Sequence, residues 1–175
     1  MVSLAFVFWM YVFLFAIIGG MRGWAKEMLV SFSVILALTF STLLTNYVPF
    51  IRDMQKDSKV LYFWLLTFIL FLLVFFGYQS PNISRFAAKM TREKLQDVIL
   101  GAVIGALNGY LIAGTIWLYM SDAGYPFTNI ITAPTGNIAT AANSMLYYMA
   151  PKLLGIPGIY FAVVIAFIFV LVVFI

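Results

Sequence analysis

The sequence contains no cysteine and no histidine, and only 9% of its 175 residues are charged. The absence of cysteine excludes disulfides and thiol chemistry, and it gives no information on whether the protein resides in an oxidising or a reducing compartment. The missing histidine removes the commonest metal and haem ligand and the usual acid–base catalyst at neutral pH. We therefore expect no bound metal, no cofactor and no ordinary enzymatic activity.

What the sequence has instead is apolar material: 65% of the residues are hydrophobic, and the mean hydropathy is +1.07. In soluble proteins roughly 45–50% of residues are apolar and about 25% are charged. A soluble fold of this size still leaves much of its surface in water, where so many apolar side chains would have no place. The composition predicts an all-α polytopic membrane protein.

Charge-free apolar runs set the number of spans. A helix needs about 20 apolar residues to cross the hydrocarbon core, where its backbone polar groups must be satisfied internally. A single membrane domain over residues 1–175 is predicted, with four to five transmembrane helices at residues 1–21, 28–50, 60–78, 98–120 and 156–175. Whether the last run spans the membrane or folds back is left open, because Pro157 and Gly158 stand at its start.

The first run has a second interpretation, a cleaved signal peptide. It lacks a basic start, however, and its length and its exit at Gly19-Gly20-Met21-Arg22 favour a retained span.

A neutral stretch separates the last two predicted spans. Residues 123–151 carry no charge and contain Pro126, Pro134 and Pro151. Because proline interrupts a helix, this stretch is predicted to be a loop or interfacial segment with a short helix near residues 139–149.

Basic residues set the orientation. Lys and Arg favour the cytoplasmic side, and the first and third connectors together hold six of them against four in the others. This predicts an N-terminus outside and the proline-containing segment outside. The net charge of +4 indicates contact with phospholipid rather than nucleic acid. The residues expected at lipid headgroups are Arg22, Lys26, Arg85, Lys89 and Arg92. The last three share one helix face, which either lies on anionic lipid or is an ordinary solvated helix end.

Glycines at four-residue spacing give the strongest local signal. Gly101, Gly105 and Gly109 lie on one face of the fourth predicted span, and Gly19 and Gly23 repeat the spacing where the first span ends. Such a face lets another backbone approach closely, either from the same chain or from another subunit.

Polar side chains inside the spans are few. Asn108 is the clearest, and we expect its amide to hydrogen-bond to a neighbouring helix. All Asp and Glu residues fall in connectors or at span edges, so no proton path is expected within the spans. Asp97 is predicted to be the N-terminal cap and dipole partner of the fourth span, paired with Lys94 three residues earlier.

Three stretches, residues 17–27, 94–97 and 100–109, resemble in order the colicin V production (CvpA) family of bacterial inner-membrane proteins. The resemblance implies a multi-pass protein of the bacterial cytoplasmic membrane that is linked to toxin production, export or envelope upkeep. It supplies no catalytic residues. The chain departs from the family in lacking an acidic residue within the first span and in its apolar final run.

The function expected is that of an accessory or structural membrane protein in the lipid bilayer, assembling with partner subunits or with itself. One alternative is a small subunit of a respiratory or photosynthetic membrane complex, and another is a transporter or export component. Co-purifying subunits in mild detergent would favour assembly, whereas a lone homo-oligomer with a wet central cavity would favour transport.

Overall fold

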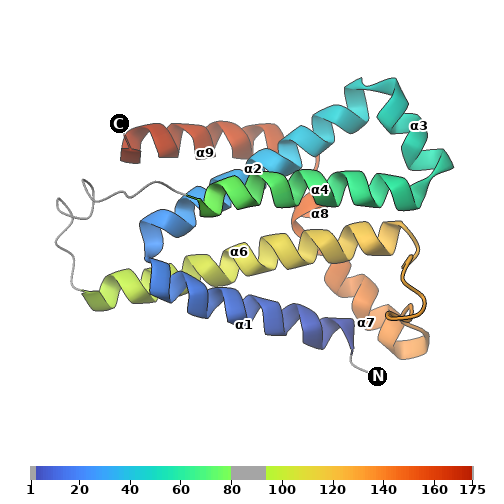
Figure 1. The fold of residues 1–175 in the computed structure, drawn as a ribbon, viewed down its shortest axis with the longest axis horizontal. Helices are drawn as coiled ribbons and strands as arrows, with labels where there is room; N and C mark the ends of the chain where they lie inside the picture. Colours follow the sequence, from blue (N-terminus) through green and yellow to red (C-terminus); the bar gives the residue numbers. More distant parts are fainter. Residues whose placement is uncertain (1–2, 80–93, 175) are drawn as a thin grey trace.

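The computed structural model describes residues 3–79 and 94–174, and all regular structure within them is helical (Figure 1). The helices are α1 (Leu4–Arg22), α2 (Trp24–Tyr47), α3 (Pro49–Asp57), α4 (Lys59–Tyr78), α6 (Lys94–Asp122), α7 (Gly136–Tyr147), α8 (Ala150–Leu153) and α9 (Gly158–Phe174). Four of them, α1, α2, α4 and α6, are long and apolar enough to cross a membrane. This confirms the all-α, multi-pass prediction.

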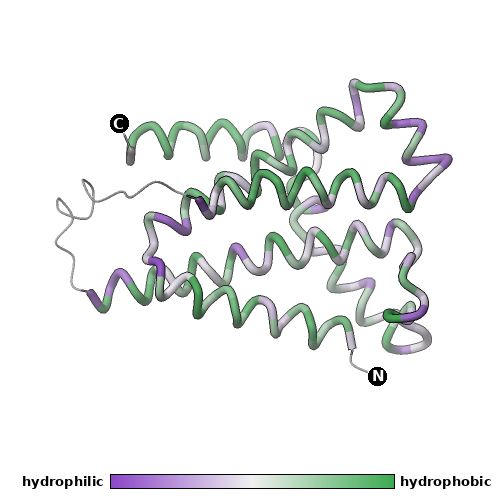
Figure 2. Tube along the Cα trace, in the orientation of Figure 1, coloured by the Kyte–Doolittle hydropathy of each residue, from purple (hydrophilic) through white to green (hydrophobic). Residues whose placement is uncertain are grey.

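The four spanning helices run alongside one another, with the N-terminus and the C-terminus towards opposite ends of the bundle (Figure 1). α1 packs on α6, α2 packs on both α4 and α6, and α9 packs on α2. We call the end where α1 joins α2 the turn end, and the opposite end the α3/α7 end. Hydrophobic residues dominate the lengths of these helices, and hydrophilic residues gather towards their ends and on α3 (Figure 2).

One of the two buried clusters in the bundle consists mainly of small and branched side chains. Val30, Val34 and Ala37 of α2 are fully buried, and they belong to one cluster with Leu70 of α4 and Ile112 of α6. Lipid tails are as apolar as these side chains, so close van der Waals contact rather than transfer out of water holds the helices together.

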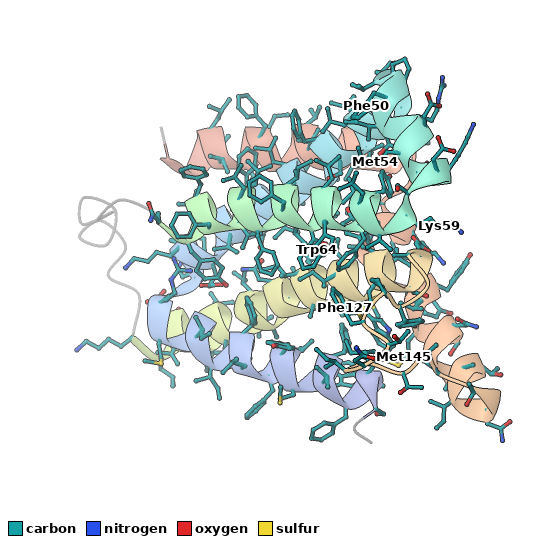
Figure 3. All side chains as sticks on the ribbon, turned by 45° about the vertical axis from the view of Figure 1, so that its right-hand side comes forward. Phe50, Met54, Lys59, Trp64, Phe127 and Met145 are labelled. Carbon is teal, nitrogen blue, oxygen red and sulfur yellow. The ribbon has the colours of Figure 1, made fainter. Side chains whose placement is uncertain are left out.

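The second predicted span ends earlier than expected. α2 stops at Tyr47, because Val48 takes an extended conformation ahead of Pro49, and α3 then begins at that proline. The expected polar connector is therefore mostly helix. Phe50 and Met54 project from α3 at the same end of the molecule as Lys59 (Figure 3).

The neutral segment behaves as predicted only in part. Its short helix is present as α7, but the chain then turns back into the bundle instead of staying at the surface. Met149 and Ala150 are 1% and 2% exposed. Met149 lies where a side chain on Gly114 would otherwise sit, so that glycine makes room for the inward turn.

α9 starts beside the middle of α2 and runs towards the turn end (Figure 1). It has 17 residues, against 19 or more in each of the four candidate spans. At about 1.5 Å per residue, it is close to the shortest helix that crosses the hydrocarbon core. A fifth span therefore stays a prediction.

Candidate functional site

The glycines bring the backbones of α1 and α6 into contact. A Cβ placed on Gly19 would overlap the carbonyl oxygen of Gly101 and lie 2.7 Å from the Cα of Gly105. A Cβ on Gly109 would lie 2.8 Å from the Cβ of Phe15 and 3.0 Å from the Cα of Val12. Residues with side chains would push these backbones apart. This glycine seam is thus occupied by a helix of the same chain.

Gly23 forms the turn between α1 and α2. Its φ of 86° and ψ of 155° lie in a region that side chains strongly disfavour. A Cβ there would also come within 2.7 Å of Asp97 Oδ2. Glycine is therefore required both by the backbone conformation and by the approach of α6.

Asp97 caps a different helix from the one predicted. α6 begins at Lys94, so Asp97 lies in its first turn. From there its Oδ1 accepts a hydrogen bond from the backbone N–H of Trp24, at 3.2 Å. That N–H is one of the unsatisfied donors at the start of α2, whose own N-cap, Gly23, provides no side-chain acceptor. Asp97 thus caps α2 rather than α6, and it fixes α2 to α6; its place in the first turn of α6 agrees with the predicted interaction with that helix dipole.

A buried ion pair lies beside this turn. Arg22 Nη1 is 2.6 Å from Glu27 Oε1, and the Glu27 side chain is fully buried. The same guanidinium group donates through Nη2 to the backbone carbonyl of Tyr78, at 3.0 Å, and lies over the Tyr78 ring at 4.3 Å. Arg22 was expected at the lipid headgroups. The structure shows 20% of its side chain exposed and its guanidinium group bound to Glu27 and Tyr78.

Asn108 completes the cluster from α6. Its amide nitrogen donates to Glu27 Oε2 at 2.8 Å and to the Glu27 carbonyl oxygen at 2.9 Å. Its amide oxygen accepts from the Ser31 hydroxyl at 2.6 Å. This confirms that Asn108 bonds to a neighbouring helix. Both carboxylate oxygens of Glu27 are thereby engaged, one by Arg22 and the other by Asn108.

Together these contacts join all four spanning helices. Arg22 ends α1, Glu27 and Ser31 lie on α2, Tyr78 ends α4, and Asn108 belongs to α6. We call Arg22, Glu27, Ser31, Tyr78 and Asn108 the polar cluster. A buried charge is costly unless it is paired and hydrogen-bonded, and here every contact lowers that cost.

The model of the family described as "Colicin V production protein" matches residues 4–154. The chain belongs to the colicin V production family. The matched residues include the glycine seam and the whole polar cluster, and they leave α9 outside. No curated protein and no solved structure gives a significant match.

For this colicin V production family member, sequence reasoning found Asn108 and the seam glycines but missed the role of Glu27. Hydropathy assigned Arg22 and Glu27 to a polar connector, whereas α2 begins at Trp24 and includes the glutamate. One signal was available. Glu27 and Ser31 are four residues apart, which places them on one helix face that a buried amide such as Asn108 can meet.

Four further basic residues were predicted to contact lipid headgroups. Among the described residues, Lys26 has no ion-pair partner and is still expected to meet lipid headgroups. Arg85, Lys89 and Arg92 lie outside the described residues.

Proposed function

We propose that this protein is an accessory or structural protein of the bacterial cytoplasmic membrane, with its N-terminus outside, that assembles with other membrane proteins in toxin production, export or envelope upkeep. The observation that carries the proposal is the polar cluster. Its buried charges are engaged with each other and tie the four spanning helices together.

A proton relay or a coupled transporter needs an ionisable group that exchanges its proton or ion with a water-filled path. Glu27 is 0% exposed, and its two oxygens bind Arg22 and Asn108. Both oxygens of this carboxylate are engaged inside the bundle, and its charge balances that of Arg22. This favours a structural role for the cluster over a transport role.

α9 supplies the surface that we assign to the partner. Phe161, Ile165, Ile168 and Val172 are each more than half exposed, and their spacing places them on one helix face. This face is apolar and points away from the bundle, and α9 lies outside the residues matched by the family model. A partner peculiar to this member of the family would fit a helix of that kind.

Recovery of partner subunits from the native membrane tests the proposal. The tagged full-length protein is extracted in mild detergent, sized, and its stoichiometric companions are identified by mass spectrometry. We expect a defined set of membrane proteins with the wild type. The triple variant Phe161→Ala, Ile165→Ala, Ile168→Ala should lose them while keeping its own thermal unfolding temperature.

Phe68→Ala with Phe75→Ala provides the matched control, because both side chains are more than half exposed on α4 and lie within the family match. The control should retain the companions. Equal recovery from the triple variant would rule out α9 as the contact. A wild-type protein that purifies alone and moves a solute across vesicles would overturn the accessory function.

A further inference from the structure

A polar crevice lies at the α3/α7 end, between the start of α4 and the end of α6. It encloses about 410 Å³, and its lining combines the polar residues Gln55, Lys59, Tyr62, Tyr119 and Asp122 with Phe63, Leu66 and Ala123. Such a set of charged, amide and hydroxyl groups suits a polar ligand at a membrane surface.

Two opposite charges line this crevice without forming an ion pair, and Asp122 also lies within electrostatic reach of Lys152. Lys59 begins α4 and Asp122 ends α6, and both residues are exposed. In the part of the chain that the structure describes, neither forms an ion pair within 4.0 Å or a side-chain hydrogen bond. The ammonium and the carboxylate therefore remain available to a ligand that carries both signs of charge.

An apolar groove lies next to the crevice, along helices that are apolar enough to cross a membrane. It encloses about 490 Å³, lies between α1, α4 and α6, and includes Phe71 and Ile112 among its lining residues. Phe63 lines both the groove and the crevice, so the two spaces are neighbours at this residue. On α4 the groove extends from Phe63 to Phe71, which is about 12 Å along the helix axis at about 1.5 Å per residue.

Aromatic side chains frame the place where the two spaces meet. The ring of Phe127 lies 5.9 Å from that of Phe63 and 5.6 Å from that of Trp64 (Figure 3). Trp64 is 51% exposed, and tryptophan is enriched at the level of lipid headgroups. The aromatic group thus marks the depth at which a headgroup gives way to an acyl chain.

We propose that the crevice and the groove form one binding site for a phospholipid with a primary-amine, zwitterionic headgroup. The lipid ammonium contacts Asp122, the phosphate contacts Lys59, and an acyl chain passes Phe63 into the groove. This arrangement gives Lys59 and Asp122 each an ionic contact and fills the apolar groove with one amphiphilic molecule. The site does not depend on which face of the membrane the α3/α7 end occupies.

The test measures lipid binding to the purified, delipidated protein by native mass spectrometry. The probes are phosphatidylethanolamine, phosphatidylcholine and phosphatidylglycerol with identical acyl chains. We expect the wild type to prefer phosphatidylethanolamine. Asp122→Asn should weaken phosphatidylethanolamine binding about two- to fivefold, as for a part-exposed charge pair. It should leave phosphatidylglycerol binding unchanged. Lys59→Gln should weaken the binding of both phosphatidylethanolamine and phosphatidylglycerol, because both lipids carry the phosphate.

Asp53→Asn is the matched control, since it removes the same charge from α3, where the side chain is exposed and does not line the crevice. It should leave the lipid preference unchanged. Ala113→Phe adds bulk inside the groove and should weaken all three lipids together. Thermal unfolding of each variant verifies that it is folded, and the two charge variants lie at exposed positions.

Glycerophosphoethanolamine, which has the headgroup without acyl chains, separates a lipid from a soluble zwitterion. We expect it to bind far more weakly than the whole lipid. Equal binding would overturn the lipid site and assign the crevice to a soluble ligand. Equal binding of the three lipids to the wild type, or an unchanged preference in Asp122→Asn, would also overturn the proposal.

Discussion

Glu27 shows how this membrane protein accommodates a fully buried carboxylate. Its charge is balanced by Arg22, its second oxygen is bound by Asn108, and the ring of Tyr78 lies beneath the arginine. Replacing such a pair by apolar residues is often tolerated, whereas removing one partner leaves a buried charge alone. Removing either charge alone should therefore destabilise the protein more than expected from the variant that lacks both charges.

Glu27→Gln should lower the free energy of unfolding by about 2–4 kcal/mol, somewhat below the usual range for a broken buried pair because Arg22 is 20% exposed. Arg22→Gln should cost a similar amount. The double variant should lose clearly less than the sum of the two, because neither charge then remains unpaired. Denaturant unfolding in detergent gives all three values, and strict additivity would show that the two residues do not act as a pair.

At the scale of the element, the contact between α1 and α6 is made by backbone rather than by side chains. Gly19, Gly101 and Gly105 approach so closely that any Cβ would overlap the facing helix. The spacing of the glycines was visible in the sequence. Their partner was not, because a glycine face fits a helix of its own chain as well as one from another subunit.

Gly105→Leu should destabilise the protein far more than Leu107→Ala in the same helix. A Cβ on Gly105 would overlap the carbonyl oxygen of Phe15, whereas Leu107 is 49% exposed. We expect the free energy of unfolding to fall by about 1–3 kcal/mol or more in the glycine variant, and by about 0.5 kcal/mol or less in the leucine variant. Thermal unfolding in detergent compares them, and equal stabilities would remove the claim of close backbone packing.

At the scale of the whole molecule, the two ends of the bundle contain different polar features. The turn end contains the polar cluster and the Asp97 cap, and the α3/α7 end contains the crevice and the inward turn at Met149. Gln55 on α3 and Gln96 at the start of α6 are exposed at opposite ends. If the bundle spans the membrane, these two positions must face opposite compartments.

Single cysteines at Gln55 and Gln96 test this topology, because the chain has no cysteine of its own. In sealed vesicles of known orientation, an impermeant thiol reagent should label Gln55→Cys from outside and Gln96→Cys from the cytoplasmic side only. Labelling of both from one side would contradict the spanning bundle. Labelling of Gln96→Cys from outside would reverse the proposed orientation.

Apolar runs were enough to locate the four spanning helices, because each must cover the hydrocarbon core with uncharged residues. They were not enough to locate the polar cluster. Hydropathy treats Arg22 and Glu27 as a connector, and the neutralisation of one by the other depends on how α1 and α2 meet at Gly23. The inward turn at Met149 was equally hidden, since it depends on the space above Gly114, a contact between distant parts of the chain.

The central claim is that the buried charges of this bundle hold its helices together and do not carry ions. Proton flux in vesicles tests it most directly, with purified protein, an imposed pH gradient and a pH-sensitive dye inside. We predict that the wild type gives no more flux than protein-free vesicles, and that Asp97→Asn, which keeps an acceptor for the Trp24 N–H, behaves identically. Flux through the wild type that disappears in folded Asp97→Asn or Glu27→Gln would contradict the claim and make the protein a transporter.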